Sequence, residues 1–500
     1  MECLQYVAAQ IFCTQIRRKD AMNSIDIAII LAYFASMIFL GLYSSKKQRG
    51  VDDYYVGGRS MGALKIGALW MAGWIGGSSV IGTSSNAYSL GITGIWYVAA
   101  IAGGCIVFAF TMSAPIKRIS SKLHNITLPE LIISRYDRKT GIMCSITTIL
   151  AMVGYTAAQF VAGSSILNVL TGWNLSVCYV ISAVVIVFYV STGGLLAVTY
   201  TDIVQMVLLI LGVVILGVPT VSSLIRSEGL SFASLPESYF DLGAWGWGTI
   251  IALALSTVLS FFTSMDSYTR CIASKDMKSA RLGTIYAAIA VLVIAGASTY
   301  LGMAGKLLMP DLESSNNVLA MLIVNVLPHG LKGLILVGIL CAIMSTADIS
   351  VLTASASLTK DIYQKYINKN ADEKKLMHIG FLCSVLVGAA GALFGWFNQD
   401  IMNLLLITFT INSAGLFLPC VCAFFWKKSC ASGSFVSMVA ATVIAVIWYI
   451  GGKVSSLPIF GIDAIWPAFG ISALLYLIIC LTHKSTPEEE EQAEFFYTVR

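Results

Sequence analysis

Long apolar runs, separated by short polar segments, repeat along almost the whole chain. A helix of about 20 apolar residues crosses the ~30 Å hydrocarbon core of a bilayer, and lipid offers its backbone no outside hydrogen-bond partner. Thirteen such runs lie near residues 24–44, 62–86, 91–114, 141–168, 174–192, 199–221, 246–265, 283–305, 330–358, 376–397, 400–425, 432–452 and 463–482. The pattern predicts an all-α, polytopic membrane protein of about 13 transmembrane helices in one membrane domain.

The composition also indicates lipid as the solvent. Of the 500 residues, 57% are hydrophobic and only 11% are charged, whereas a soluble domain carries about 25% charged residues. The net charge of +5 is too small to indicate a nucleic-acid partner. The sequence holds no phosphate-binding loop, zinc-protease motif or nucleophile elbow. We therefore expect neither an ATP-driven pump nor an enzyme.

The basic residues predict an orientation. If the N-terminus lies outside and the runs alternate, 24 of the 31 Lys and Arg residues fall in inside loops. Cytoplasmic loops carry such an excess, which predicts a plasma-membrane protein with an outside N-terminus and a cytoplasmic C-terminus. Residues 1–21 break the pattern, and we interpret them as an extension that is not native, with Met22 as the start. Residues 22–484 form the membrane domain, and residues 485–500 a solvated, disordered acidic tail.

The second run carries small residues where a lipid-facing helix would carry large ones. Glycines weaken a helix, and irregular backbone at this depth is tolerated only inside protein or beside a cavity. Transporters use broken helices of this kind to hold cations with free carbonyl oxygens. Close packing against another helix is the alternative. The run reads Gly67-Ala68-Leu69-Trp70-Met71-Ala72-Gly73-Trp74-Ile75-Gly76-Gly77-Ser78-Ser79.

The seventh run ends in a dense group of polar residues. It begins five runs after the glycine-rich run, and interruptions at matching places in two halves are typical of an inverted repeat. No residue-level similarity supports the repeat, so it is a hypothesis from the pattern alone. The polar residues are Ser260, Thr263, Ser264, Asp266 and Ser267.

The ninth run places Ser345, Asp348 and Ser355 on one helix face. Hydroxyl and carboxylate oxygens are hard ligands that suit a hard cation. A charge at the bilayer centre costs about 2.5–3.5 kcal/mol on insertion scales, so Asp348 indicates a function. The hydroxyls have the alternative of bonding back to their own helix. Asp202, which opens the sixth run, either belongs to this set or caps its helix.

Four segments of the chain resemble the sodium:solute symporter family, which contains bacterial proline, pantothenate, sugar and sialic acid transporters. They occur in the family's order on the topology counted above, and the resemblance covers nearly the whole membrane region. The resemblance implies a five-plus-five inverted-repeat core, with repeats at about 62–221 and 246–425. The segments are Asp53–Ser60, Gly193–Gln205 with Asp202, Arg270–Asp276, and Ser345-Thr346 leading to Asp361–Tyr363.

The resemblance also implies where ions and solute bind. The main sodium ion would be held by the carbonyl oxygens of Ala68, Met71 and Ala342 and the hydroxyls of Ser345 and Thr346. Some family members hold a second sodium, and Asp202 and Asp348 fall where its ligands would be. By position, the solute would be lined by Trp74, Ser78, Tyr155, Gln159, Thr257, Phe261 and Asn412.

Two positions depart from known branches of the family. Proline transporters tend to carry Asp where this chain has Trp70, and the sialic acid branch carries an Arg near the position of Tyr155. Without that Arg, a carboxylate has no obvious charged clamp. Aromatic walls suit a small, partly apolar solute, and they suit plain packing almost as well.

The expected function is sodium-coupled symport of a small organic solute into the cell by alternating access. Proton coupling through Asp202 or Asp348 is the nearest alternative, followed by a membrane solute sensor. Na⁺ is the expected coupling ion, and a monomer is sufficient because one chain holds the whole predicted site. The identity of the solute does not follow from the sequence.

Overall fold

The protein was analysed as a computed structural model. It describes residues 23–45, 59–124, 127–454, 457 and 461–499, with backbone alone at residues 34, 37, 38, 40–45, 78, 170, 189, 190, 192–201, 326, 453 and 454. The proposed extension at 1–21 and most of the segment Asp53–Ser60 lie outside the described residues.

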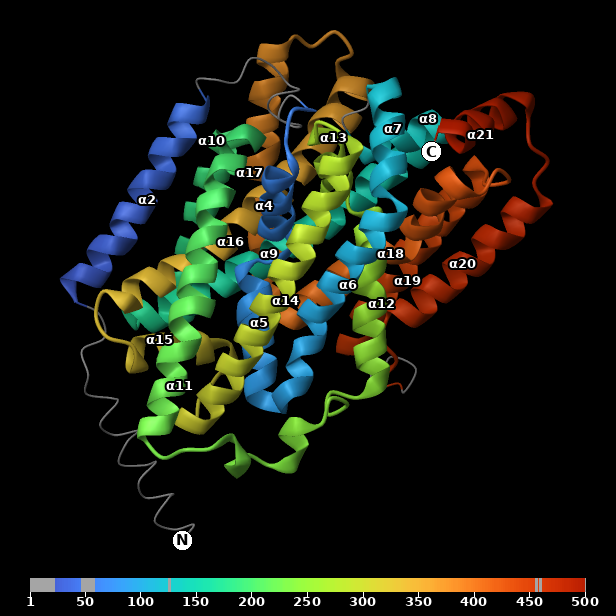
Figure 1. The fold of residues 1–500 in the computed structure, drawn as a ribbon. Coiled ribbons are helices and arrows are strands. Elements are labelled where there is room, and N and C mark those ends of the chain that lie inside the picture. The colour runs from blue at the N-terminus through green and yellow to red at the C-terminus, as the bar shows by residue number, and fades with distance from the viewer. Residues whose placement is uncertain (1–22, 46–58, 125–126, 455–456, 458–460, 500) are drawn as a thin grey trace.

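Helices make up most of the described chain (Figure 1). The first half contains α2 (Ser24–Ser45), α4 (Ala63–Trp74), α5 (Gly77–Leu90), η2 (Gly91–Ile95), α6 (Trp96–Thr111), α7 (Ser113–Leu123), α8 (Leu128–Arg135), α9 (Arg138–Thr171), α10 (Leu175–Leu209), the π-helix η3 (Ile210–Gly217) and α11 (Val218–Ser227). The second half contains η4 (Phe232–Ser234), η5 (Glu237–Phe240), α12 (Trp247–Thr263), α13 (Met265–Ala273), α14 (Met277–Leu308), η6 (Ser315–Asn317), α15 (Val318–Val326), α16 (Leu331–Ala356), the π-helix η7 (Ser357–Ile367), α17 (Glu373–Phe397), α18 (Ile401–Phe425), α19 (Ala431–Val454), α20 (Ile465–Thr482) and α21 (Pro487–Val499).

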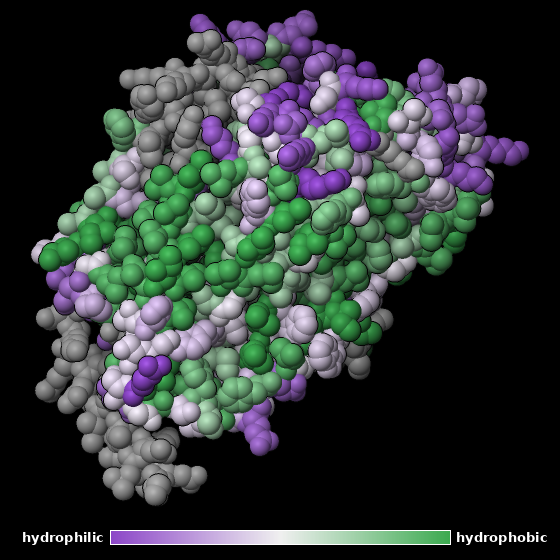
Figure 2. Space-filling view, viewed as in Figure 1, coloured by the Kyte–Doolittle hydropathy of each residue, from purple (hydrophilic) through white to green (hydrophobic). Residues whose placement is uncertain are grey.

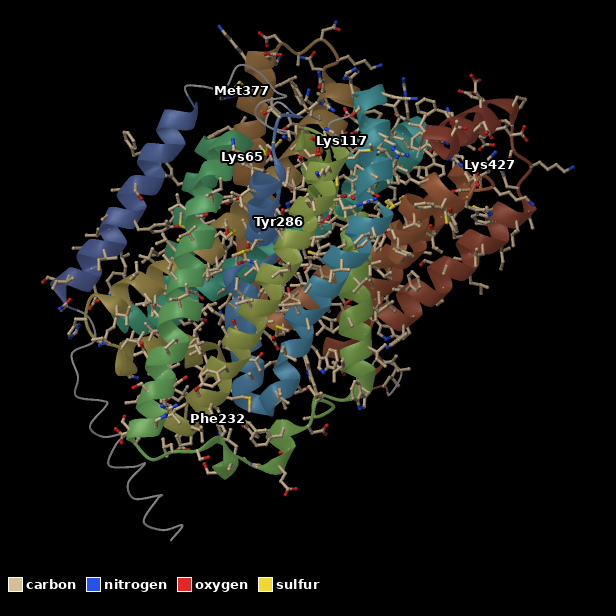
Figure 3. The ribbon with its side chains drawn as sticks, in the orientation of Figure 1. Lys65, Lys117, Phe232, Tyr286, Met377 and Lys427 are labelled. Atoms are coloured by element: carbon tan, nitrogen blue, oxygen red, sulfur yellow. The ribbon has the colours of Figure 1, made fainter. Side chains whose placement is uncertain are left out.

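The length and hydropathy of its helices identify the described part of the chain as a polytopic membrane protein. Nine of its helical stretches are long and apolar enough to cross a bilayer, or ten if the bent pair α12 and α13 is one span. Figure 2 shows apolar side chains covering the middle of the molecule, with hydrophilic ones gathered at one end. Lys65, Lys117 and Lys427 lie at that end, and Phe232 lies at the opposite end (Figure 3).

The helix α16 lies at the centre of the bundle. In its most apolar stretch 94% of the residues are buried, against 28% in the corresponding stretches of α19 and α20. It packs against α9, α10 and α17 and against both halves of the glycine-rich run, α4 and α5. Lipid therefore solvates the peripheral helices, while α16 is surrounded by protein.

Two apolar runs are interrupted in mid-course. In the second run α4 ends at Trp74, and α5 begins at Gly77 after an extended Gly76 (φ −90°, ψ 175°). In the seventh run α12 ends at Thr263 and α13 begins at Met265, with a 46° bend between them. The predicted runs 174–192 and 199–221, in contrast, are not separated by a break. Both fall in one helical stretch that continues through Gly193 and Gly194. Glycine in an apolar setting still satisfies its backbone best as helix.

The acidic tail is a helix, and the expectation of disorder is wrong. A capping box begins α21: the Thr486 amide donates to Glu489 Oε2 (2.9 Å), and the Glu489 amide donates to Thr486 Oγ1 (3.3 Å). Pro487 opens the helix, where its missing amide hydrogen is no loss. Phe496 is 1% exposed and packs edge-on against Phe424 of α18. The glutamate run is thus the first turn of a docked helix.

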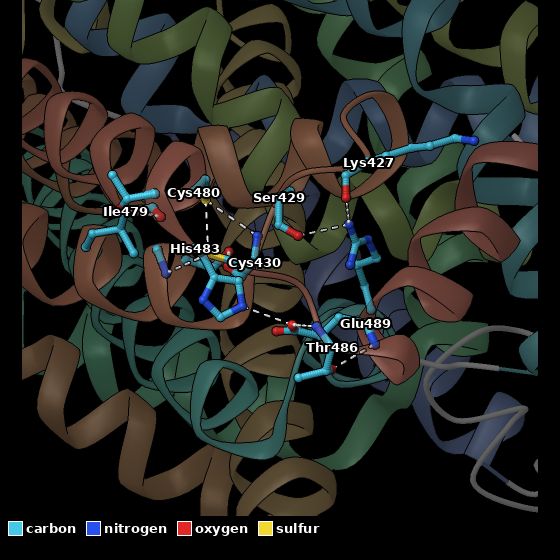
Figure 4. Close-up of polar contacts among 12 residues, drawn as sticks. Lys427, Ser429, Cys430, Ile479, Cys480, His483, Thr486 and Glu489 are labelled. Atoms are coloured by element: carbon cyan, nitrogen blue, oxygen red, sulfur yellow. Dashed lines mark hydrogen bonds and ion pairs between the residues drawn. The ribbon is translucent and has the colours of Figure 1, made fainter.

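The docking of α21 should weaken as pH rises. His483 Nε2 lies 2.9 Å from Glu489 Oε2 (Figure 4), and this hydrogen bond raises the pKa of His483 above its ordinary value. A raised pKa in the docked state stabilises docking fully below the ordinary pKa of about 6.5, and the contribution is lost as pH rises through the raised pKa. We divide the rate of trypsin cleavage at Lys484 by the rate for His483→Gln at the same pH. This ratio should therefore be higher at pH 8.5 than at pH 6. An unchanged ratio would contradict this prediction.

Candidate functional site

The break between α4 and α5 exposes backbone oxygens to side chains of other helices. The Ile75 amide still donates to the Met71 oxygen (2.7 Å), and Ser79 Oγ donates to the Trp74 oxygen (3.1 Å). The oxygen of Gly73 accepts instead from the hydroxyl of Tyr155 on α9 (3.3 Å). The broken helix is thus held by contacts from outside its own turn.

Two hydroxyls of α16 converge on the carbonyl oxygen of Ala72, just before this break. Thr346 Oγ1 donates to it at 2.7 Å, and Ser345 Oγ lies 3.3 Å from it and 3.2 Å from the Ala342 oxygen. Ala68 and Met71 lie on the same α4 segment, each 1% exposed. The oxygen that the hydroxyls contact, that of Ala72, was not among the predicted ligands.

This group of oxygens fits an alkali cation chemically, because hydroxyl and carbonyl oxygens are hard, neutral ligands. Gly76 allows the close approach. A Cβ atom there would lie 2.5 Å from Thr346 Oγ1 and 2.8 Å from Gln159 Oε1. The glycine therefore keeps the hydroxyl against the α4 break.

Two carboxylates lie deep in the bundle near these oxygens. Asp202 on α10 and Asp348 on α16 are both 0% exposed, and their helices pack together. Within the described part of the chain, neither oxygen of Asp202 has a hydrogen-bond partner. Asp202 lies inside α10, which Asn174 caps, so the interpretation of Asp202 as a helix cap is wrong. Two buried carboxylates on helices that pack together favour a nearby cation or a bound proton.

A small cavity lies between the two helix breaks. Its volume is about 10 Å³, enough for about one water molecule, so the aromatic residues around it are closed together. Trp74 stacks on Phe261 with ring centroids 3.8 Å apart, and Phe409 lies 5.7 Å from Trp74. The cavity is lined by Gly73, Trp74, Met152, Tyr155, Ser264, Asp266, Ile349, Ser350, Thr408, Phe409 and Asn412.

The predicted solute residues divide into three groups. Trp74, Tyr155 and Asn412 line the cavity, and Phe261 stacks on Trp74. Thr257 is buried one helical turn before Phe261 on α12, and Gln159 lies at the Gly76 break beside Thr346. The side chain of Ser78 lies outside the described residues.

Sequence reasoning missed several residues of the cavity wall. Ser350, Thr408 and Phe409 carry no local signal that separates them from other buried residues of α16 and α18. Asp266 did carry one, because it belongs to the polar group that ends the seventh run and pairs with Arg270 at the spacing of four that faces residues on one helix side.

Comparisons with known proteins agree on the class. The model of the family described as "Sodium:solute symporter family" matches residues 54–441. Sodium/proline symporters of Staphylococcus aureus strains JH9 and COL are each 27% identical, over 91% of this chain and 92% of the relative. A solved sodium-coupled sialic acid symporter, substrate-bound and outward-open, has a TM-score of 0.76 at 19% identity, covering 92% of this chain and 98% of its own. A closed transporter of the nucleobase-cation-symport-1 family has a TM-score of 0.54 at 15% identity, covering 89% and 98%. Because the family model spans more than half of the chain, this protein belongs to the sodium:solute symporter family.

Proposed function

We propose that the protein imports a small, partly apolar organic solute together with sodium by alternating access. One observation carries the proposal: the Ser345 and Thr346 hydroxyls meet the Ala72 oxygen at the α4 break, beside the aromatic cavity. The relatives named for sodium coupling support the choice of ion.

The proposed frame is 13 transmembrane helices around a five-plus-five inverted repeat, with repeats at about 62–221 and 246–425. The breaks at Gly76 and Ser264 support it, because they fall in runs five apart. The proposed orientation has the N-terminus outside and the C-terminus in the cytoplasm of a plasma membrane. It is supported by Lys65, Lys117 and Lys427, which lie at the same end of the molecule as α21 (Figures 1 and 3).

The coupling follows from the order of residues along α4. Ala72 contacts the α16 hydroxyls, and the next two residues, Gly73 and Trp74, line the cavity. A sodium ion arriving from outside takes the place of the hydrogen bonds to Ala72 and is held by these oxygens with Ala68, Met71 and Ala342. Holding this backbone sets the position of Trp74 and thereby shapes the solute site. The repeats then rock, and both ligands leave to the cytoplasm.

The membrane potential supplies much of the driving force. One positive charge crossing 100 mV is worth about 2.3 kcal/mol, and about 1.4 kcal/mol corresponds to tenfold. One sodium per solute thus supports roughly fifty-fold accumulation before any sodium gradient is added. A second sodium squares that factor, so the stoichiometry decides the capacity of the transporter.

We place a second cation at Asp202 and Asp348 because both carboxylates are buried on helices that pack together. Asp202→Asn and Asp348→Ala should then lower the number of charges moved per solute from two to one. The measurement is the reversal potential in proteoliposomes with the solute gradient fixed. One sodium per solute, unchanged in Asp348→Ala, would remove the second site from the proposal.

Replacing sodium by choline tests the function itself. A thermal-shift screen of metabolites with and without sodium comes first, because a ligand that binds the folded state raises its apparent stability. Uptake of the identified solute should then fall to background in choline medium at constant pH. Uptake that ignores sodium and follows pH would instead favour proton coupling through the buried Asp202.

A further inference from the structure

An ion pair lies buried at the second helix break. Arg270 Nη1 donates to Asp266 Oδ2, and their side chains are 4% and 8% exposed. Ser264, the residue of the break itself, donates its hydroxyl to Asp266 Oδ1. Asp266 and Ser264 both line the cavity, so the wall contributed by α13 is charged while the facing wall is aromatic.

Arg270 also joins the two broken helices. Its Nε donates to the Leu69 oxygen of α4 (3.0 Å), and its guanidinium lies 4.8 Å from the ring of Trp70. The remaining nitrogen, Nη2, is buried and makes no hydrogen bond within the described residues. It lies against Gly73, where any side chain would collide with it, and Gly73 is itself part of the cavity wall.

Helix stability accounts for only part of this arrangement. An acidic residue in the first turn of α13 is favoured by the helix dipole, and a spacing of four favours the pair. Neither effect requires burial, and a buried ion pair is seldom more stable than apolar residues of the same size. Neither effect explains why this guanidinium nitrogen lies without an acceptor among the described residues, against Gly73 of the cavity wall.

Building on the proposed transport function, we propose that Asp266 and Arg270 bind the charged groups of the solute and thereby select a zwitterion. Its ammonium binds Asp266, and its carboxylate accepts from Arg270 Nη2. The two side chains are in contact, so the matching charges of the solute are adjacent, as in an α-amino or α-imino acid. The rings of Trp74 and Phe409, which line the cavity, pack on its apolar body.

Asp266 and Arg270 neutralise each other when no solute separates them. A zwitterion adds no net charge, so the low-dielectric site stays neutral when the solute enters. A neutral sugar carries no charges that would compensate Asp266 and Arg270 if the pair separated. A lone anion leaves its charge beside Asp266, and a lone cation leaves its charge beside Arg270.

Binding to the purified full-length protein in lipid nanodiscs tests the proposal with matched probes. The probes are the 20 proteinogenic amino acids, D-glucose, and two single-charge analogues of L-proline, tetrahydro-2-furoate and pyrrolidine. At least one α-amino or α-imino acid should bind in sodium but not in choline, and each single-charge analogue should bind at least tenfold more weakly. Sodium-dependent binding of glucose or tetrahydro-2-furoate without any amino acid would overturn the charge selection and leave sodium symport intact. Binding unaffected by sodium would overturn symport itself.

The variant Asp266→Asn separates solute recognition from a structural role. It should weaken binding of the amino acid at least tenfold and strengthen binding of its ammonium-free analogue, because Arg270 then faces a single negative charge. A structural role would weaken both probes alike and would refute the proposal. The thermal shift produced by sodium alone should persist, since the α16 hydroxyls are untouched, and its persistence shows that the variant is folded. Asp276→Asn is the matched control, because Asp276 caps α14 through the Ser279 amide (2.6 Å) away from the cavity. If Asp266→Asn does not fold, the probe panel on the unaltered protein decides.

Discussion

Replacing Thr346 by Ala is expected to raise the sodium concentration for half-maximal uptake by roughly 5- to 150-fold. The Thr346 hydroxyl is 0% exposed and donates to the Ala72 oxygen at 2.7 Å. Removing one partner of a buried polar contact costs about 1–3 kcal/mol, which corresponds to that range of binding constants. The measurement is the initial rate of solute uptake into proteoliposomes as sodium replaces choline.

The matched control for this substitution is Ser355→Ala. Ser355 lies on the same helix, is also 0% exposed and also donates to a backbone oxygen, that of Gly380 on α17 (2.8 Å). Its loss should lower the melting temperature without changing the sodium dependence. A sodium dependence that moves equally in both variants would mean that the α16 hydroxyls contribute to stability and not to ion binding.

Gly76→Ala should reduce sodium-driven uptake at least tenfold. The backbone of Gly76 is extended, a conformation that alanine adopts freely, so the effect comes from space alone. The added Cβ would lie 2.5 Å from Thr346 Oγ1 and 2.8 Å from Gln159 Oε1. Overpacking of this kind costs about 1–3 kcal/mol, and it drives the Thr346 hydroxyl away from Ala72.

The control for the glycine is Gly103→Ala on α6, where an added Cβ meets nothing within 4 Å. Gly103→Ala should leave uptake unchanged and raise stability slightly, since alanine is the better helix former. Uptake per folded molecule, measured at low and saturating sodium, separates the two substitutions. Full activity of Gly76→Ala would show that the break tolerates a side chain and does not depend on this contact.

The membrane class and the helix breaks could be predicted because each has a local cause. Apolar runs of about 20 residues need only the composition of one helix. The glycines around Gly76 and the polar group before Asp266 mark the interruptions in the chain itself. The hydroxyls of α16 likewise stand out, because Ser345 and Thr346 follow a long apolar stretch and begin the polar part of the run that includes Asp348.

Contacts between distant segments could not be predicted in this way. Arg270 and Leu69 are 201 residues apart, and their contact depends on how two broken helices cross. Which carbonyl oxygen of α4 contacts the α16 hydroxyls, that of Ala72 or a neighbour, depends on the turn at Ile75. The composition of the segment does not specify this turn. The α21 helix was missed for another reason: the glutamate run was read as a charge run, although Thr486 and Pro487 precede it as helix-start signals.

The succession Ala72-Gly73-Trp74 has a consequence for engineering. The residue that contacts the ion site and the residues that line the cavity are consecutive in α4. A substitution at Trp74 that reshapes the cavity will therefore also disturb sodium affinity. Thr408 and Asn412 line the same cavity from α18, a separate helix. Redesign of solute preference should begin on α18, because substitutions there change the cavity wall and leave the residues of the sodium site unchanged.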